Sequence, residues 1–258
     1  MIVKEFLSKR KLNIICSAAA ILFMWLVWMI AFYAVGNEYI IPSFTATFVS
    51  LGKCFAEGSF WIAFLNTLLR TALAAVISFA LAAALAVGSV LSKAFYAFVK
   101  PFMAFFRTLP TLAVILVLLV WTSPKIAPII VTALVLFPIM YSQLTAAAFG
   151  IDQGLLEMAE VYRLPKKVKL FKIYLPLVSP NILSQTGPNV SLGIKIMISA
   201  EVLANTYKSL GGLMQEARLY VEMPRLAALT LAAVAAGFIF DIALSQLERV
   251  TFKWSRKE

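Results

Sequence analysis

Four long, mostly apolar stretches of this chain carry no charged side chain, and they restrict the fold more than any other feature. They cover residues 12–37, 71–92, 108–124 and 126–151. A helix needs about 20 mostly apolar residues to cross a bilayer. The whole chain is 62% hydrophobic and 14% charged, whereas soluble domains are about 25% charged. The sequence therefore predicts an all-α integral membrane protein.

About six membrane-spanning helices are expected, in one domain that occupies residues 1–258. Their approximate ranges are 12–36, 64–92, 102–122, 126–149, 181–204 and 226–247, and a long loop covers 152–180. The fifth range is the least apolar because it contains Lys195 and Glu201. Pro110, Pro138 and Pro188 are expected to break or kink their spans, since proline removes a helical hydrogen bond.

Lysine and arginine outnumber aspartate and glutamate by 23 to 12, which gives a net charge of +11. In a soluble chain this excess would favour nucleic-acid binding. In a membrane protein it marks the loops that stay in the cytoplasm. With six spans, most basic residues fall on the same side as the two termini. We therefore expect a multi-pass protein of a bacterial-type inner membrane, with both termini in the cytoplasm and no nucleic-acid partner.

The chain contains no histidine and only two cysteines, Cys16 and Cys54. Without histidine, His-based acid–base chemistry, His-ligated metals and His-activated nucleophiles are excluded. The two cysteines do not have the spacing of a metal site. The sequence also lacks the G-x-x-x-x-G-K-[ST] pattern of a nucleotide-binding loop. We therefore expect no catalytic centre and no cofactor or metal held by this chain.

The loop between the fourth and fifth spans has an informative order of side chains. Acidic residues come first and lysines follow, which complements a helix dipole. Pro165 interrupts a continuous helix, so a short helix, a bend and a second amphipathic piece are expected. In the second piece, apolar residues recur at helical spacing; they are Leu164, Val168, Phe171 and Leu175. Such a segment fits a groove of a cytosolic partner or the anionic headgroups of the bilayer.

The same loop resembles the EAA loop of permease subunits of ATP-binding-cassette importers. That pattern is E-A-A, three residues, G, nine residues and I-x-L-P, and the residues at these positions are Glu157, Met158, Ala159, Arg163, Ile173, Leu175 and Pro176. The resemblance implies that these residues, together with Leu164, Val168 and Phe171, form the coupling surface for the ATPase. Arg163 replaces the usual glycine, and arginine tolerates a positive φ poorly. We therefore expect Pro165 to supply the bend instead.

Further segments are similar to the nitrate, sulfonate and taurine branch of these permeases. They lie at residues 106–113, 200–201 and 211–218, and the whole resemblance extends from about residue 64 to 252. It implies a type I importer permease with a cytoplasmic coupling helix between the fourth and fifth spans. It also implies a second permease subunit, cytosolic ATPase subunits that carry ATP-Mg, and an extracytoplasmic solute-binding protein.

Charged side chains inside predicted spans are costly and usually face a cavity or a partner. Ser191, Lys195 and Ser199 repeat every four residues and predict one polar stripe on the fifth helix, which fits the wall of a path for an anion. The candidate path residues are Arg107, Thr108, Pro110, Asn189, Ser191, Lys195, Ser199 and Glu201. Alternatively, Lys195 or Arg107 pairs with Asp241, or Lys195 extends its stem toward water.

These features together predict the permease subunit of an ATP-driven importer for a small oxyanion, such as a sulfonate, taurine or nitrate. A vitamin precursor or another heterocycle is an alternative solute for the same class of importer. An ion-coupled secondary transporter is a rival class. It would use carboxylates in mid-membrane, for which only Asp241 and Glu201 qualify. A membrane enzyme is disfavoured by the lack of histidine and of clustered acids.

Overall fold

The computed structural model describes the backbone of residues 2–251 and the side chains of residues 15–246. Within residues 2–251 all regular secondary structure is helical, as predicted. The helices are α1 (Ile2–Val35), α2 (Phe44–Ala56), α3 (Gly58–Leu91), α4 (Lys93–Thr108), α5 (Thr111–Trp121), α6 (Ala127–Phe149), α7 (Gln153–Val161), α8 (Lys166–Lys169), the π-helix η1 (Leu170–Tyr174), α9 (Leu175–Ala204), α10 (Leu210–Leu219) and α11 (Met223–Thr251). The terminal lysines and arginines that contribute to the predicted orientation lie outside the described side chains.

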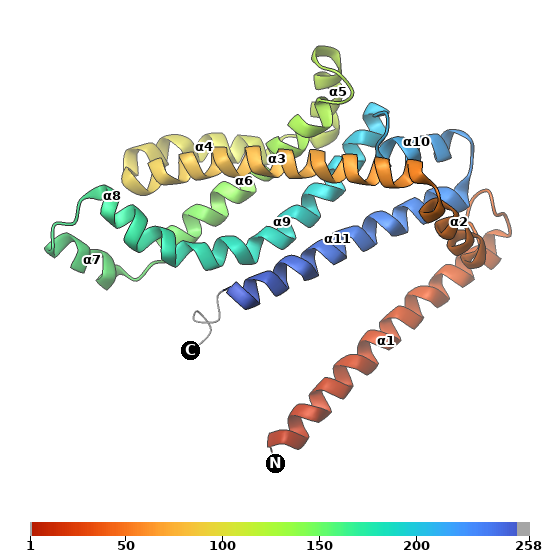
Figure 1. Ribbon diagram of the computed structural model, residues 1–258, viewed down its shortest axis with the longest axis horizontal. Coiled ribbons are helices and arrows are strands. Elements are labelled where there is room, and N and C mark those ends of the chain that lie inside the picture. Colours follow the sequence, from red (N-terminus) through yellow and green to blue (C-terminus); the bar gives the residue numbers. More distant parts are fainter. Residues whose placement is uncertain (1, 252–258) are drawn as a thin grey trace.

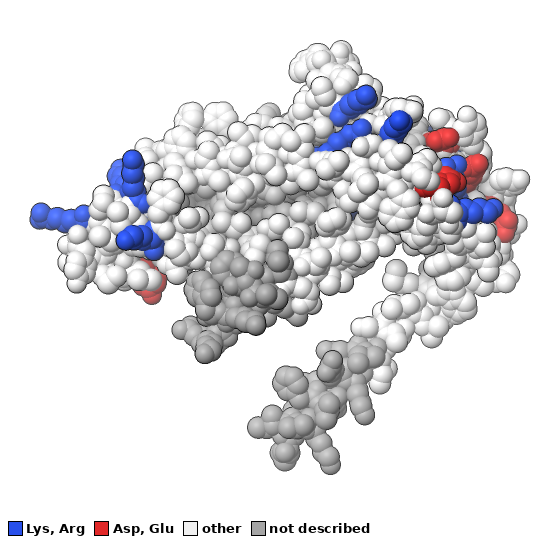
Figure 2. Space-filling view, viewed as in Figure 1, with Lys and Arg blue, Asp and Glu red and all other residues white. Residues whose placement is uncertain are grey.

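Four helices in the described part of the chain are long and apolar enough to cross a membrane. They are the Ile15–Val35 part of α1, α3, α6 and the Met223–Gln246 part of α11, and α4 with α5 adds a fifth if that bent pair counts as one span. Figure 2 shows a broad middle surface with few charged side chains, and charges gathered toward the ends. The fold is therefore that of a multi-pass membrane protein. Six spans remain a prediction, because the more polar α9 is not among these helices.

Helices α3, α6, α9 and α11 run side by side and form the body of the molecule (Figure 1). Helices α7 and α8 lie at one end of this bundle, and α2 and α10 lie at the other. We call these the α7 end and the α10 end. Helix α1 leaves the bundle obliquely, and none of its described side chains is buried. Its base is held by Trp28, whose indole N–H donates to the carbonyl of Pro42 at 3.0 Å.

One face of α3 carries small side chains and packs against α6 and α9. The buried members of this face are Ala63, Thr67, Thr71, Ala74, Ser78, Ala82, Ala86 and Ser89. Small residues allow helix backbones to approach closely, which is how helices associate within a bilayer. Two hydroxyl groups also bond across the α3–α6 contact: Ser78 donates to the carbonyl of Ala133 at 3.0 Å, and Ser89 shares a 2.8 Å bond with Tyr141.

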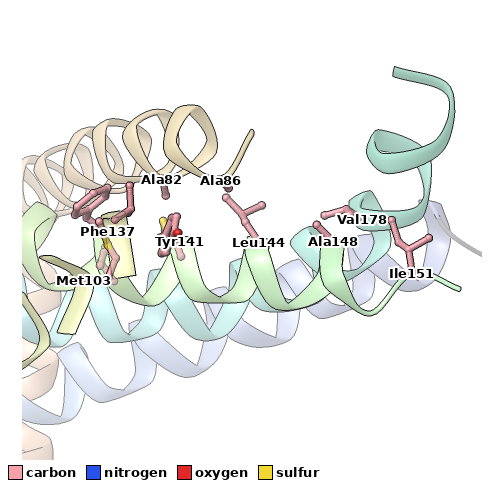
Figure 3. Close-up of a cluster of buried hydrophobic side chains, with 12 residues drawn as sticks. Ala82, Ala86, Met103, Phe137, Tyr141, Leu144, Ala148, Ile151 and Val178 are labelled. Atoms are coloured by element: carbon pink, nitrogen blue, oxygen red, sulfur yellow. The ribbon is translucent and has the colours of Figure 1, made fainter. Parts of the chain in front are cut away.

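The largest buried cluster fills the space between α3, α4 and α6 (Figure 3). Tyr141 and Leu144 of α6 pack there against Ala82 and Ala86 of α3. The cluster continues to the α7 end through Val178 of α9. The start of α9 and the end of α6 are thus parts of the same core.

The third predicted span, at residues 102–122, is not one straight helix. Helix α4 begins earlier, at Lys93, and it meets α5 at an angle of 92°. Pro110 causes the break because proline holds the preceding residue in an extended conformation, and Leu109 has ψ of 123°. Pro138 and Pro188 do not break their spans, since they lie inside the continuous helices α6 and α9, and a kink at either proline stays a prediction.

Candidate functional site

The 152–180 loop folds as a short helix, a turn and a second helix, as its sequence predicts (Figure 1). Asp152 caps the first helix, α7, and its carboxylate accepts hydrogen bonds from the backbone N–H groups of Gly154 at 2.6 Å and Leu155 at 3.3 Å. Such caps satisfy backbone donors that have no partner within the helix. The cap therefore fixes where α7 begins at its end of the bundle.

The turn after α7 is made by Arg163, which corrects the expectation that Pro165 supplies the bend. Arg163 has φ of 48°, in the left-handed region. The N–H of Arg163 donates to the carbonyl of Glu160 at 2.8 Å, and the N–H of Leu164 donates to the carbonyl of Ala159 at 3.0 Å. This is the Schellman arrangement, in which glycine usually takes the left-handed position. The glycine geometry of the EAA pattern is thus kept although the residue is arginine.

The second helix continues without a gap into the membrane-spanning bundle. Helix α8, the π-helix η1 and α9 follow one another from Lys166 to Ala204, so this helix begins well before the predicted start at residue 181. Lys169 lies 3.8 Å from the carboxylate of Glu160 and connects α8 to α7. Burial, with a further contribution from the Glu160 charge, raises the pKa of Tyr174. Its hydroxyl is therefore neutral at physiological pH.

Helix α7 presents an apolar face to solvent, which we call the α7 face. Its members and their exposed fractions are Leu155 (39%), Met158 (49%), Val161 (81%) and Tyr162 (74%). Glu157 is also exposed, whereas Ala159 is fully buried against the bundle. Of the predicted coupling residues on α7, Glu157 and Met158 thus lie outward and Ala159 lies inward. The sequence prediction missed Leu155, Val161 and Tyr162, although their spacing of three to four residues from Met158 would have indicated them.

The predicted coupling residues after the turn do not form the single docking face that was expected. Leu164, Val168 and Ile173 are partly buried. Phe171 and Leu175 are exposed, but they border an apolar pocket of about 340 Å³ against α3. Pro176 is exposed one residue further along α9. These residues therefore belong to the base of α9, and the outward apolar surface belongs to α7.

A second candidate site is a groove between α5, α6 and α9, which we call the α5–α9 groove. It has a volume of about 270 Å³, and its polar lining residues are Thr111, Lys195 and Ser199. Both Lys195 and Ser199 are exposed. The remaining lining residues are Leu112, Ile115, Val131, Ile196, Ala200 and Leu203. A cation in a mostly apolar groove fits the predicted wall of a path for an anion.

Three other predicted path residues lie at the α4–α5 bend, directly before this groove in the chain. Arg107 is exposed, and its guanidinium donates to the carbonyl of Pro138 at 3.2 Å. The hydroxyl of Thr108 donates to the carbonyl of Phe105 at 2.8 Å. Pro110 is the first residue before α5. Among the described side chains, neither Arg107 nor Lys195 forms an ion pair with Asp241, so the pairing alternative is not observed.

The remaining predicted path residues lie in helix contacts and not in the groove. Asn189 is buried and exchanges two amide hydrogen bonds with Gln143 of α6, at 2.8 and 3.2 Å. Ser191 turns toward α11, since its hydroxyl would lie 3.1 Å from a Cβ placed on Gly237. Glu201 is fully buried and forms a 2.9 Å ion pair with Arg70. The predicted polar stripe is therefore reduced to Lys195 and Ser199.

Most of this chain matches a known protein family. Residues 78–253 match the family described as the binding-protein-dependent transport system inner membrane component. The matched range includes the α7 turn, the α5–α9 groove and most of the bundle. The chain belongs to this family. As a transport component, it is not an enzyme.

Two curated relatives of this inner membrane component are named aliphatic sulfonates transport permease protein SsuC. The one from Bacillus subtilis (strain 168) is 28% identical over 166 residues, which are 63% of this chain and 59% of the relative. The one from Escherichia coli (strain K12) is 28% identical over 154 residues, which are 58% of this chain and 57% of the relative. The match thus spans less than two thirds of the length of these relatives.

Two solved structures share the fold of this inner membrane component. A crystal structure of an amino acid ABC transporter with histidines matches with a TM-score of 0.60 and 17% identity, over 73% of this chain and 90% of that chain. A bacterial alginate ABC transporter, solved in complex with an alginate pentasaccharide-bound periplasmic protein, matches with a TM-score of 0.63 and 18% identity, over 90% and 93%. The expected type I importer permease fold is therefore confirmed.

Proposed function

We propose that this chain is the membrane-spanning permease subunit of an ATP-driven importer. Its membership in a family of binding-protein-dependent transport components supports this assignment. The observation that carries it is the α7 face, where four apolar side chains are exposed on a short helix between α6 and α9, two long helices of the bundle. An exposed amphipathic helix of this kind fits a hydrophobic groove of a partner protein. The partner in this proposal is a cytosolic ATPase subunit.

The remaining partners follow from the same proposal. A second permease subunit completes the path, in the simplest case a second copy of this chain. Two ATPase subunits bind and hydrolyse ATP-Mg, and an extracytoplasmic binding protein delivers the solute. The alginate transporter with a similar fold is solved with a periplasmic protein, which supports the last of these partners. The α7 end then faces the cytoplasm, together with both termini, as the distribution of basic residues favours.

A displacement of α7 would be transmitted to α9, the helix that lines the proposed path. The Schellman turn and the Lys169–Glu160 pair attach α7 to α8, and α8 continues through η1 into α9. Because α9 also carries Lys195, closure of the ATPase pair would tilt the helix that lines the α5–α9 groove. Small displacements at such a site become rigid-body movements of packed helices. This gives alternate exposure of the path to the two sides of the membrane.

The proposed solute is a small oxyanion, such as a sulfonate, taurine or nitrate. Lys195 supplies an exposed cation in the groove, and Arg107 supplies a second at the preceding bend. The names of the two curated relatives, which refer to aliphatic sulfonates, support the same chemistry. A vitamin precursor or another heterocycle is the alternative solute, and it would not require Lys195.

The assignment is tested by purifying the tagged chain from its native membranes in a mild detergent and quantifying associated ATPase subunits by mass spectrometry. Wild-type protein should retain such a subunit. The double variant Met158→Glu/Val161→Glu places two charges on the α7 face, and desolvating them in an apolar groove is costly. We expect the amount of ATPase recovered with this variant to fall at least roughly tenfold, which corresponds to a loss of about 1.4 kcal/mol of binding free energy.

A control is Tyr207→Glu, which places a charge on a side chain in the linker beside α10 whose exposed fraction (70%) lies between those of Met158 and Val161. It should retain the ATPase at the wild-type level. Equal ATPase recovery with the Met158→Glu/Val161→Glu variant, or no ATPase with the wild-type chain, would contradict the proposal.

A further inference from the structure

The α10 end contains a buried polar network that belongs to neither candidate site. Glu201, near the end of α9, is fully buried. Its carboxylate accepts hydrogen bonds from Arg70 at 2.9 Å, from the hydroxyl of Thr67 at 2.8 Å and from the backbone N–H of Gly211 at 3.3 Å. The hydroxyl oxygen of Thr67 in turn accepts from the N–H of Leu210 at 3.0 Å. The network thus joins α3, α9 and the first turn of α10.

The two backbone groups in this network need partners from outside their own helix. The first N–H groups of a helix have no acceptor within it, and a buried donor without a partner is costly. Leu210 and Gly211 are the first two residues of α10, and both are buried. Thr67 and Glu201 therefore complete the start of α10 with groups from two other helices. A carboxylate at a helix N-terminus is also favoured by the helix dipole.

Close packing holds α10 on α9 at the same point. A Cβ at Gly211 would overlap the Cβ of Glu201 and would lie 2.6 Å from the backbone nitrogen of Val202. A side chain at this position would therefore push the two helices apart. Leu210 and Ala217 of α10 pack in one buried cluster with Ile194 of α9.

The linker before α10 is attached to its neighbours as well. The hydroxyl of Thr206 donates to the carbonyl of Pro124, in the turn before α6, at 2.7 Å. The side-chain amide of Asn66 on α3 donates to the carbonyl of Lys208 at 3.1 Å. Asn205 and Lys208 both have positive φ, at 48° and 51°. Backbone in this region persists where the surrounding structure fixes it, so the linker is not a free hinge.

We propose that Thr67 and Glu201 are positioning residues that join α10, the end of α9 and the adjoining part of α3 into one rigid unit. This unit and α7 lie at opposite ends of the bundle, and α9 connects them (Figure 1). A displacement of α9 that starts at the α7 end therefore carries α10 with it, and a partner bound at the α10 end acts on α9 in return. The hydrogen bonds and packing contacts support the rigid attachment by themselves, whereas its role in transport rests on the proposed function.

Two neighbouring threonines on α3 provide a matched test of the attachment. Thr67 and Thr71 are both buried on the same face of α3. The Thr71 hydroxyl donates only within its own helix, to the carbonyl of Thr67 at 2.8 Å. Thr67→Val removes the hydroxyl that joins Glu201 to α10, and it leaves the Arg70–Glu201 pair in place. Thr71→Val removes the same kind of hydroxyl at a position that forms no hydrogen bond with α10.

The readout is hydrogen exchange, measured by mass spectrometry on the purified full-length chain in lipid nanodiscs. We expect Thr67→Val to speed exchange in the peptide that covers the start of α10 by about tenfold, as for local opening after a buried hydrogen bond is lost. Thr71→Val and Thr67→Ser, which keeps the hydroxyl, should both stay within about twofold of wild type. The attachment would be overturned if Thr67→Val left the exchange rate of this peptide unchanged. It would also be overturned if either control variant exchanged as fast as Thr67→Val.

A second readout separates this inference from the proposed function. The chain is reconstituted in liposomes with the ATPase and binding protein recovered from its native membranes, and solute uptake per ATP hydrolysed is measured. Thr67→Val should lower this ratio about fivefold, as expected if one buried hydrogen bond of the coupling unit is lost. If the wild-type chain transports solute and Thr67→Val shows the same uptake per ATP hydrolysed, the inference is overturned. A wild type without ATP-driven uptake would overturn the proposed function, and the exchange result would still stand.

Discussion

Several helices of this protein end on a single residue in the left-handed conformation, and the residue types are unusual for it. Arg163, Asn205 and Val221 have φ of 48°, 48° and 59°. At each position, the N–H of this residue and the N–H of the next residue donate the same pair of backbone hydrogen bonds, which closes a helix. Asparagine tolerates this conformation, whereas arginine and the β-branched valine are strained in it. The EAA pattern has glycine at the position of Arg163, but the expectation that Pro165 would supply the bend instead was wrong. Nothing in the sequence indicated Val221, because helix packing and not local preference selects its conformation.

The first prediction at this scale concerns the strain at Arg163. Arg163→Gly should raise the free energy of unfolding by about 1 kcal/mol, because glycine adopts positive φ without a Cβ clash. The measurement is thermal unfolding of the purified chain in detergent. Arg163→Ala removes the same exposed side chain but keeps the Cβ, so its stability should stay close to that of wild type. Equal effects of the two substitutions would show that the backbone conformation is not the cause.

For the helices, the sequence predicts where each helix lies in the chain better than it predicts which side of the helix is exposed. The helical spacing from Leu164 to Leu175 indicated one apolar face, yet Leu164 and Val168 are partly buried whereas Phe171 and Leu175 are exposed beside an apolar pocket. The π-helix η1 (Leu170–Tyr174) lies between Val168 and Leu175, and its wider turns shift the face that follows, so one helical face does not continue across it. The break at Pro110 was predictable from proline chemistry, but its angle depends on packing against α6 and α9. The small-residue face of α3 was present in the sequence at helical spacing and could have been predicted.

The α5–α9 groove gives a prediction about charge. Lys195→Gln keeps a polar side chain of similar length but removes the cation, so it should reduce uptake of an oxyanion at least roughly tenfold, and Lys195→Arg should retain most of it. The assay is uptake of radiolabelled taurine, nitrate and ethanesulfonate into cells that depend on this chain. Ser191→Ala is the control, since Ser191 turns toward α11 and should not matter. Undiminished uptake with Lys195→Gln would remove Lys195 from the path and favour an uncharged solute.

For the whole molecule, α9 connects the two ends that the proposed transport cycle requires. Its base continues into the segment that carries the α7 face, its middle carries Lys195, and its far end holds α10 through Glu201. The membrane class, the helical fold and the two short helices of the 152–180 loop were all predictable from hydropathy and the order of charges and prolines. The burial of Asn189 and Glu201 was not, because it depends on partners such as Gln143 and Arg70 that lie far away in the chain.

The most direct test of the central proposal is solute uptake into liposomes that contain the chain with the ATPase and binding protein from its native membranes. Internal and external ATP can be supplied separately, and an ion gradient can be imposed without ATP. We predict uptake that requires ATP-Mg on the α7 side together with the binding protein on the α10 side. Uptake that an ion gradient drives without ATP would contradict the proposal and identify a secondary transporter.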